Sequence, residues 1–143
     1  MSSIRDDYER GLNLYNAGDL DGYANEYTED AVLKKPDGTA RGRAAIREYW
    51  RRQKVAFPDC TLAVVAFVEQ GDNIATEWTW VGTNTGPLVL RDGTELSPMG
   101  KRIELEGMEL AKMRDGKICV YHMYWDGIAL AGQLGLLPNP PAP

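Results

Sequence analysis

Cysteine and histidine are scarce in this chain, which has two cysteines and one histidine among 143 residues. Cys60 and Cys119 lie too far apart in the sequence for a CxxC zinc or redox motif. His122 alone cannot supply the usual cluster of several histidines around a metal ion. We therefore expect two free thiols and no metal site.

Long apolar runs are also missing, since no stretch of about 18 residues could form a transmembrane helix. The segment Met1–Asp6 lacks the apolar stretch of a secretory signal. These features favour a cytoplasmic protein with no membrane partner. The length favours one domain, expected over residues 1–137 with a Pro-rich tail at 138–143, and 43% apolar residues suffice for a core and a cavity lining.

The net charge of −5 argues against nucleic acid as the main partner, although the charge is distributed unevenly. Residues 1–30 carry eight acidic and two basic side chains, whereas residues 31–54 carry eight basic and two acidic ones, so the two segments can balance each other. A basic stripe at helical spacing favours a solvated helix face over a phosphate-binding surface. The stripe consists of Arg43, Arg47, Arg51 and Lys54.

Helical periodicity dominates the first third of the chain. Tyr8, Leu12 and Tyr15 recur at i, i+4 and i+7, which predicts a helix from residue 4 to about residue 16. Asp19 can cap a second helix with Leu20, Tyr23, Ala24 and Tyr27 on one face, ending at residues 28–30. A short extended stretch at residues 31–35 and a turn at Pro36 then lead to a third helix over residues 44–56.

Strand patterns dominate the rest of the chain. Residues 61–69 and 74–81 form one expected hairpin, and residues 102–113 and 117–125 form another around Arg114-Asp115-Gly116. Residues 82–100 are a loop or a bent strand pair, and residues 126–134 form a short last helix. This order predicts an α+β fold in which three N-terminal helices pack on one side of a curved antiparallel sheet.

Glu109 is the most informative residue of the expected strand 101–113. Alternation places it on the face that also holds Ile103, Leu105, Ala111 and Met113. Burial among apolar neighbours raises the pKa of a carboxyl group and makes it a candidate proton carrier near neutral pH. The alternative is a structural glutamate that is paired with a base such as Lys35 or hydrogen-bonded to a tyrosine.

Two further acid/base candidates, His122 and Asp126, follow on the next strand with Tyr124 on the same face. His122 is either a structural side chain or a base, because histidine is the side chain that titrates near pH 7 without perturbation. Asp126 stands at the start of the last helix, where it either caps the amides of Ile128 and Ala129 or takes part in chemistry.

Aromatic side chains point to a core slab or a ligand pocket. Trp78 and Trp80 alternate onto a common face with Ile74 and Thr76, and two indoles at this spacing suit either role. Tyr15 and Tyr49 are expected to project from their helices toward the same interior, where buried hydroxyls need partners.

The order of these elements and several short motifs resemble the SnoaL-like polyketide cyclases of the nuclear-transport-factor-2-like superfamily. The resemblance covers nearly the whole chain and implies a cone of helices and curved sheet around a pocket, usually as a homodimer. The motifs are Tyr15-Asn16-Ala17-Gly18-Asp19, Gly42-Arg43-Ala44-Ala45-Ile46, Gly82-Thr83-Asn84-Thr85-Gly86, Pro98-Met99-Gly100-Lys101, Asp115-Gly116-Lys117-Ile118, Tyr124-Trp125-Asp126 and Gln133-Leu134-Gly135.

The resemblance also implies which positions carry chemistry. In the cyclases, an aspartate three residues before that of Tyr-Trp-Asp acts as acid/base, assisted by a histidine on the preceding strand; these places hold Met123 and Glu109. A further histidine of the family is replaced by Asn84, and the place of the ketosteroid isomerase base holds Lys35. Glu109 could supply the missing carboxylate from the neighbouring strand.

These observations lead to one main hypothesis and two alternatives. The main one is a cofactor-free cyclase or isomerase of a hydrophobic, carbonyl-bearing intermediate of polyketide type. Glu109 would be its base, and Trp78 and Trp80 would stack on the substrate. The alternatives are epoxide opening, as in related hydrolases and ether-forming cyclases, and a non-catalytic binding domain. The other expected participants are His122 and Asp126 in catalysis and Tyr15, Lys35, Tyr49, Asn84 and Met123 in binding.

Overall fold

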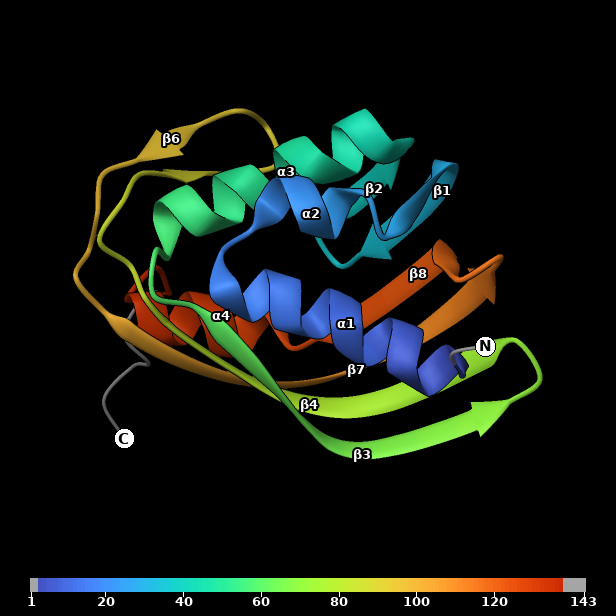
Figure 1. Cartoon of the computed structure of the whole chain (residues 1–143). Helices are drawn as coiled ribbons and strands as arrows, with labels where there is room; N and C mark the ends of the chain where they lie inside the picture. The colour runs from blue at the N-terminus through green and yellow to red at the C-terminus, as the bar shows by residue number, and fades with distance from the viewer. Residues whose placement is uncertain (1–2, 138–143) are drawn as a thin grey trace.

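Three helices lie on one face of a curved sheet in the computed structural model, which describes residues 3–137 (Figure 1). The elements follow in the order α1 (Ile4–Ala17), α2 (Leu20–Ala24), β1 (Tyr27–Lys35), β2 (Gly38–Arg41), α3 (Arg43–Ala56), β3 (Thr61–Gln70), β4 (Asn73–Thr83), β5 (Leu88–Val89), β6 (Glu95–Leu96), β7 (Arg102–Arg114), β8 (Lys117–Trp125) and α4 (Gly127–Leu134). The expected α+β cone is confirmed, with α4 as the short last helix.

Local capping explains the first two helices. The Ser3 hydroxyl accepts from the amide of Asp6 while the Asp6 carboxylate accepts from the Ser3 amide, so α1 begins with a capping box. Gly18 ends α1 in the left-handed conformation (φ 78°), which suits a residue without Cβ. The Asp19 side chain then accepts from the amide of Gly22 and caps α2, as the sequence predicts.

The prediction for Tyr27 was wrong, because α2 ends at Ala24 and Tyr27 begins β1. Tyr27 pairs with Ile118 of β8, and its hydroxyl forms a 2.8 Å hydrogen bond with that of Tyr23. Pairing with a strand 91 residues later overrides a helical pattern that is only local. The tyrosines at this spacing meet as a buried pair at the junction of helix and strand.

The main sheet has the strand order β2-β1-β8-β7-β4-β3. Its neighbours are antiparallel except for β1 and β8, which are parallel, so the sheet is mixed rather than wholly antiparallel. The inner face carries the alternate residues expected for β4 and β7, and both strands show strict alternation of buried and more exposed positions along most of their length. This inner face and the helices enclose one core.

The oppositely charged segments contact each other. Arg47 of α3 forms a 2.5 Å ion pair with Asp21 of α2, and an Arg43 nitrogen lies 3.9 Å from a Glu29 oxygen of β1. Arg43 also donates to the carbonyl oxygen of Tyr27, which ties the start of α3 to β1. All four charged side chains of these two pairs retain solvent exposure, so each pair contributes at most about 1 kcal/mol to stability.

Residues 84–101 form the long loop that connects β4 to β7. Within this loop, β5 and β6 pair only with each other. The expected Pro-rich tail at 138–143 lies outside the described residues. Cys60 and Cys119 are both buried free thiols, as expected. None of the helices within residues 3–137 has the length and apolar character needed to cross a membrane.

Candidate functional site

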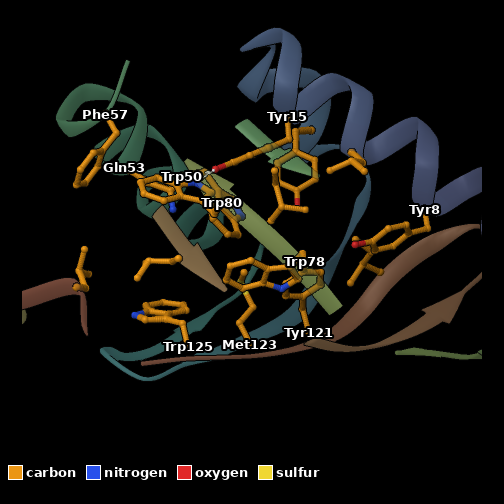
Figure 2. A pocket seen from close by; sticks show the side chains of 16 residues that line it. Tyr8, Tyr15, Trp50, Gln53, Phe57, Trp78, Trp80, Tyr121, Met123 and Trp125 are labelled. Atoms are coloured by element: carbon orange, nitrogen blue, oxygen red, sulfur yellow. Dashed lines mark hydrogen bonds between the residues drawn. The ribbon is translucent and has the colours of Figure 1, made fainter. Parts of the chain in front are cut away.

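An apolar cavity of about 80 Å³ lies between α1, α2, α3 and the inner face of the sheet (Figure 2). Most of its wall is aromatic or aliphatic, and none of the lining side chains carries a charge. The lining residues are Tyr8, Leu12, Tyr15, Tyr23, Trp50, Gln53, Phe57, Leu62, Trp78, Trp80, Leu105, Ile118, Tyr121, Met123, Trp125 and Leu130. Four candidates from the sequence, Tyr15 from α1 and Trp78, Trp80 and Met123 from the sheet, therefore line one cavity.

The cavity volume limits what fits without movement. Pockets for drug-sized ligands measure about 300–1,000 Å³, several times the volume of this cavity. A ring-sized group fits the cavity as it stands, and a larger ligand requires lining side chains to move. Four lining side chains keep partial solvent exposure, namely Leu12, Gln53, Trp125 and Leu130.

A hydrogen-bond network around Tyr15 satisfies most polar atoms at one end of the cavity. The Tyr15 hydroxyl donates to Oε1 of Gln53 (2.6 Å) and accepts from Nε1 of Trp80 (2.9 Å). The thiol of Cys60 lies 3.4 Å from the same hydroxyl. These mutual bonds fix the rings of Tyr15 and Trp80 and leave this end rigid.

Glu109 is 2% exposed and lies among apolar residues, as the alternation in β7 predicts. Two hydroxyls donate to its Oε1, that of Thr76 from the facing position in β4 at 2.6 Å and that of Tyr8 from α1. Its other oxygen, Oε2, is buried and has no hydrogen-bond partner. Glu109 is thus held by neutral hydroxyls rather than by an ion pair.

Burial raises the pKa of Glu109 from 4.5 to about 7, because a carboxylate ion loses water inside the core. The two hydrogen bonds from Thr76 and Tyr8 favour the ion and lower the pKa, but they offset only part of the burial effect. Burial and the neighbouring Glu109 charge also raise the pKa of Tyr8. Near neutral pH, the carboxyl group can therefore either hold or release a proton, while Tyr8 stays protonated.

Glu109 meets the cavity through Tyr8. The Tyr8 ring lines the cavity and its hydroxyl contacts the carboxyl group, whereas Glu109 itself is not a lining residue. Figure 2 shows Tyr8 at the end of the cavity opposite Phe57 and Gln53. Tyr8 thus connects the buried carboxyl group to the cavity wall.

Lys35 and Tyr49, two of the expected binding residues, lie outside the cavity wall. The Lys35 ammonium group lies 3.3 Å from Asp37 and 3.9 Å from the centre of the Tyr49 ring, so it is not a partner of Glu109. The Tyr49 ring packs against Trp50 instead of lining the cavity. The Lys35 side chain is only 8% exposed and Tyr49 packs against the core, so the two meet in a largely buried contact that is separate from the cavity wall.

Asn84 is fully buried, and its side chain connects backbone segments. Its amide nitrogen donates to the carbonyl oxygens of Ala56 and Gly86, and its oxygen accepts from the amide of Met99 at 2.8 Å. All its polar atoms thus have backbone partners at the end of α3. Asn84 therefore stabilises the loop of residues 84–101 and does not line the cavity.

His122 and Asp126 are also placed away from the cavity. His122 alternates with the inward Tyr121 and Met123, so it lies on the outer face of the sheet, opposite Leu110 and Lys34. The Asp126 carboxylate accepts from the amides of Ile128 and Ala129, both at 3.0 Å, and is the N-cap of α4. The capping alternative for Asp126 is therefore the one that the structure supports.

Sequence reasoning did not assign roles to Tyr8 and Thr76, the two partners of Glu109. Both lay on faces that the periodicity had identified, Tyr8 with Tyr15 on α1 and Thr76 with Trp78 on β4. The alternation of inward and outward residues places Thr76 on the inner face of β4, where a polar residue of β7 could lie opposite it. Nothing local indicated which helix would cover Glu109.

A family model identifies the family of this chain. The model of the SnoaL-like domain matches residues 8–121, which is most of the chain. A search of curated proteins found no significant match.

Solved structures show the same fold over almost the whole length. AclR of Streptomyces galilaeus, a proposed hydroxylase, is 24% identical with a TM-score of 0.80, over 96% of this chain and 88% of AclR. IdmH of Streptomyces antibioticus, a proposed polyketide cyclase, is 26% identical with a TM-score of 0.76, over 94% and 99%. A proposed SnoaL-like polyketide cyclase of Jannaschia is 19% identical with a TM-score of 0.77, over 96% and 98%.

Proposed function

Because the chain belongs to the SnoaL-like domain family, we propose that it is a cofactor-free cyclase or isomerase of a hydrophobic, carbonyl-bearing compound of polyketide type. One observation carries the proposal: a buried acid with a pKa of about 7, Glu109, is hydrogen-bonded to a tyrosine that lines an apolar cavity. The similarity to IdmH supports the substrate class.

The proposed chemistry is proton transfer at the carbon next to the carbonyl group. The Tyr8 hydroxyl passes its proton to the Glu109 carboxylate and accepts one from the ligand, which becomes an enolate. The enolate then either attacks a second carbonyl carbon and closes a ring, or takes the proton back at another atom. In the first case the proton returns from Glu109 to the new alkoxide, so the reaction needs no cofactor. The apolar wall excludes water from the enolate.

The test uses exchange of the methyl protons of acetophenone in D2O, followed by NMR. We expect Glu109→Gln to lower the protein-dependent exchange rate by about 100-fold or more, and Tyr8→Phe to lower it as well. The matched controls are Glu77→Gln, an exposed glutamate of β4, and Tyr124→Phe, an exposed tyrosine of β8. Full exchange in folded Glu109→Gln protein would refute the proposal.

A non-catalytic binding domain is the second candidate. It is favoured by the Tyr15 network, in which the Tyr15 hydroxyl, Oε1 of Gln53 and the Trp80 indole bond to one another and are not free for chemistry. Binding of acetophenone without any protein-dependent exchange would support this candidate. Epoxide opening has less support, because the described cavity wall contains no charged pair that could activate a nucleophile.

We also propose that the protein is a homodimer and that it acts in the cytoplasm. The dimer proposal rests on the outer face of the sheet, where apolar side chains remain exposed on neighbouring strands. These side chains, here called the outer apolar patch, are Val68, Met108, Leu110 and Tyr124. The location rests on the two unpaired thiols, which a reducing compartment preserves.

A further inference from the structure

Trp78 lines the cavity and has an unused hydrogen-bond donor. The residue is 2% exposed, and its Nε1–H has no hydrogen-bond partner among the described residues. A buried donor without an acceptor has lost its bonds to water, and such groups normally meet an acceptor on protein, water or ligand. Because the ring forms part of the cavity wall, a molecule in the cavity can supply the acceptor for Trp78.

Trp80 provides a direct comparison on the same strand. It also lines the cavity and lies two residues further along the same face of β4, but its Nε1–H donates to the Tyr15 hydroxyl. The fold thus satisfies one of two neighbouring indole donors internally and leaves the other unsatisfied. In Figure 2 the Trp78 indole lies among the lining side chains, and no dashed line reaches its nitrogen.

Gly107 fixes the position of the Trp78 ring. A Cβ atom at Gly107 would lie 2.4 Å from Cζ2 and Cη2 of Trp78, so the indole lies directly on the β7 backbone. Trp78 pairs with Gly107 and Thr76 pairs with Glu109 in the register of β4 and β7. Trp78 and Glu109 are therefore diagonal neighbours on the inner face, about 7–8 Å apart between backbones.

We propose that the Nε1–H of Trp78 binds the carbonyl oxygen of the ligand beside the Tyr8–Glu109 pair and stabilises the negative charge that develops there. This role is distinct from stacking, because it selects ligands by an acceptor atom. An uncharged donor in an apolar wall suits a flat, apolar molecule with one inward oxygen, such as an aryl ketone. The ligand class rests on the proposed function, whereas the donor itself rests on the geometry of Trp78.

The test compares acetophenone with α-methylstyrene, which has the same shape but a CH2 group in place of the oxygen. The chain has four tryptophans, and the Trp78→Phe and Trp80→Phe variants assign their indole signals in the ¹⁵N-labelled protein. We expect acetophenone to move the Trp78 indole proton downfield and α-methylstyrene to leave it in place. Acetophenone binding with an unmoved Trp78 signal, or no acetophenone binding, would overturn the proposal.

Affinity gives a second readout. The preference of the protein for acetophenone over α-methylstyrene should fall about three- to tenfold in Trp78→Phe and persist in Tyr124→Phe, an exposed aromatic position outside the cavity. An equal loss in both variants would contradict a specific donor. Where Trp78→Phe fails to fold, nuclear Overhauser contacts with Gly107 assign the Trp78 signal in the unaltered protein, and its shift then decides the matter. Binding through Trp78 without proton exchange would refute the proposed function alone, and exchange with an unmoved Trp78 signal would refute this inference alone.

Discussion

Tyr8 and Glu109 lie 101 residues apart in the sequence and share a buried hydrogen bond in which the tyrosine hydroxyl donates to Oε1 of the carboxyl group. Thr76 donates to the same oxygen. Among residues 3–137, Oε2 has no partner and no cation pairs with Glu109 to balance its charge when it ionises. The carboxyl group is therefore a buried titratable site whose protonation affects both stability and the proposed chemistry.

Glu109 should make stability depend on pH between about 4.5 and 7. Its pKa is raised to about 7 in the folded protein, so in this interval the unfolded chain releases the proton while the folded one retains it. The free energy of unfolding attributable to Glu109 should therefore fall as the pH rises from 4.5 to 7, by about 3 kcal/mol in total, and stay constant above 7. Urea unfolding of wild type and Glu109→Gln across this range measures the difference. Parallel pH curves would contradict the raised pKa.

Gly107→Ala should destabilise the protein by about 1–3 kcal/mol or more, because the added Cβ would overlap the Trp78 ring and approach the backbone oxygen of Tyr124 to 2.6 Å. Gly11→Ala is the control, since its Cβ meets its nearest neighbour at 3.6 Å in the middle of α1, where alanine favours the helix. Chemical denaturation of both variants tests this. Equal stabilities would mean that Trp78 does not rest on Gly107.

Asn84→Asp should destabilise the protein by about 3 kcal/mol or more. The amide group that donates to the carbonyls of Ala56 and Gly86 would be replaced by an oxygen, and a charge would be buried beside them. Asn73→Asp, at an exposed position of β4, should change stability little. Thermal melts of the two variants provide the measurement. A stable Asn84→Asp protein with lost acetophenone binding would instead favour the binding role expected from the sequence.

Leu110→Arg should convert the proposed dimer to a monomer, because it places a charge in the outer apolar patch, where Leu110 is 46% exposed. Ile128→Arg is the matched control, since Ile128 is 73% exposed but belongs to α4. Light scattering after size exclusion should report a dimer for wild type and Ile128→Arg and a monomer for Leu110→Arg. A monomeric wild type at micromolar concentration would reject the dimer.

Local sequence patterns correctly predicted those features that depend only on the helix or strand in which a residue lies. Period-two alternation placed Glu109, Trp78 and Trp80 on inward faces of β7 and β4, because successive strand residues point to opposite sides whatever the strand packs against. Asp126 behaved as a helix cap, since capping needs only the next two or three amides. These features follow from local backbone geometry, so the sequence alone is enough to predict them.

Features that depend on distant partners emerged only in the tertiary structure. Tyr27 fits a helix face locally, but pairing with β8 makes it the first residue of a strand. His122 alternates correctly, but only the side on which the helices pack decides that its face is the outer one. The sequence by itself thus determined that Glu109 is buried among apolar residues. Which groups would meet it, Tyr8 from α1 and Thr76 from β4 rather than Lys35, was decided by packing, because contacts between elements far apart in the chain leave no periodic signal in either element.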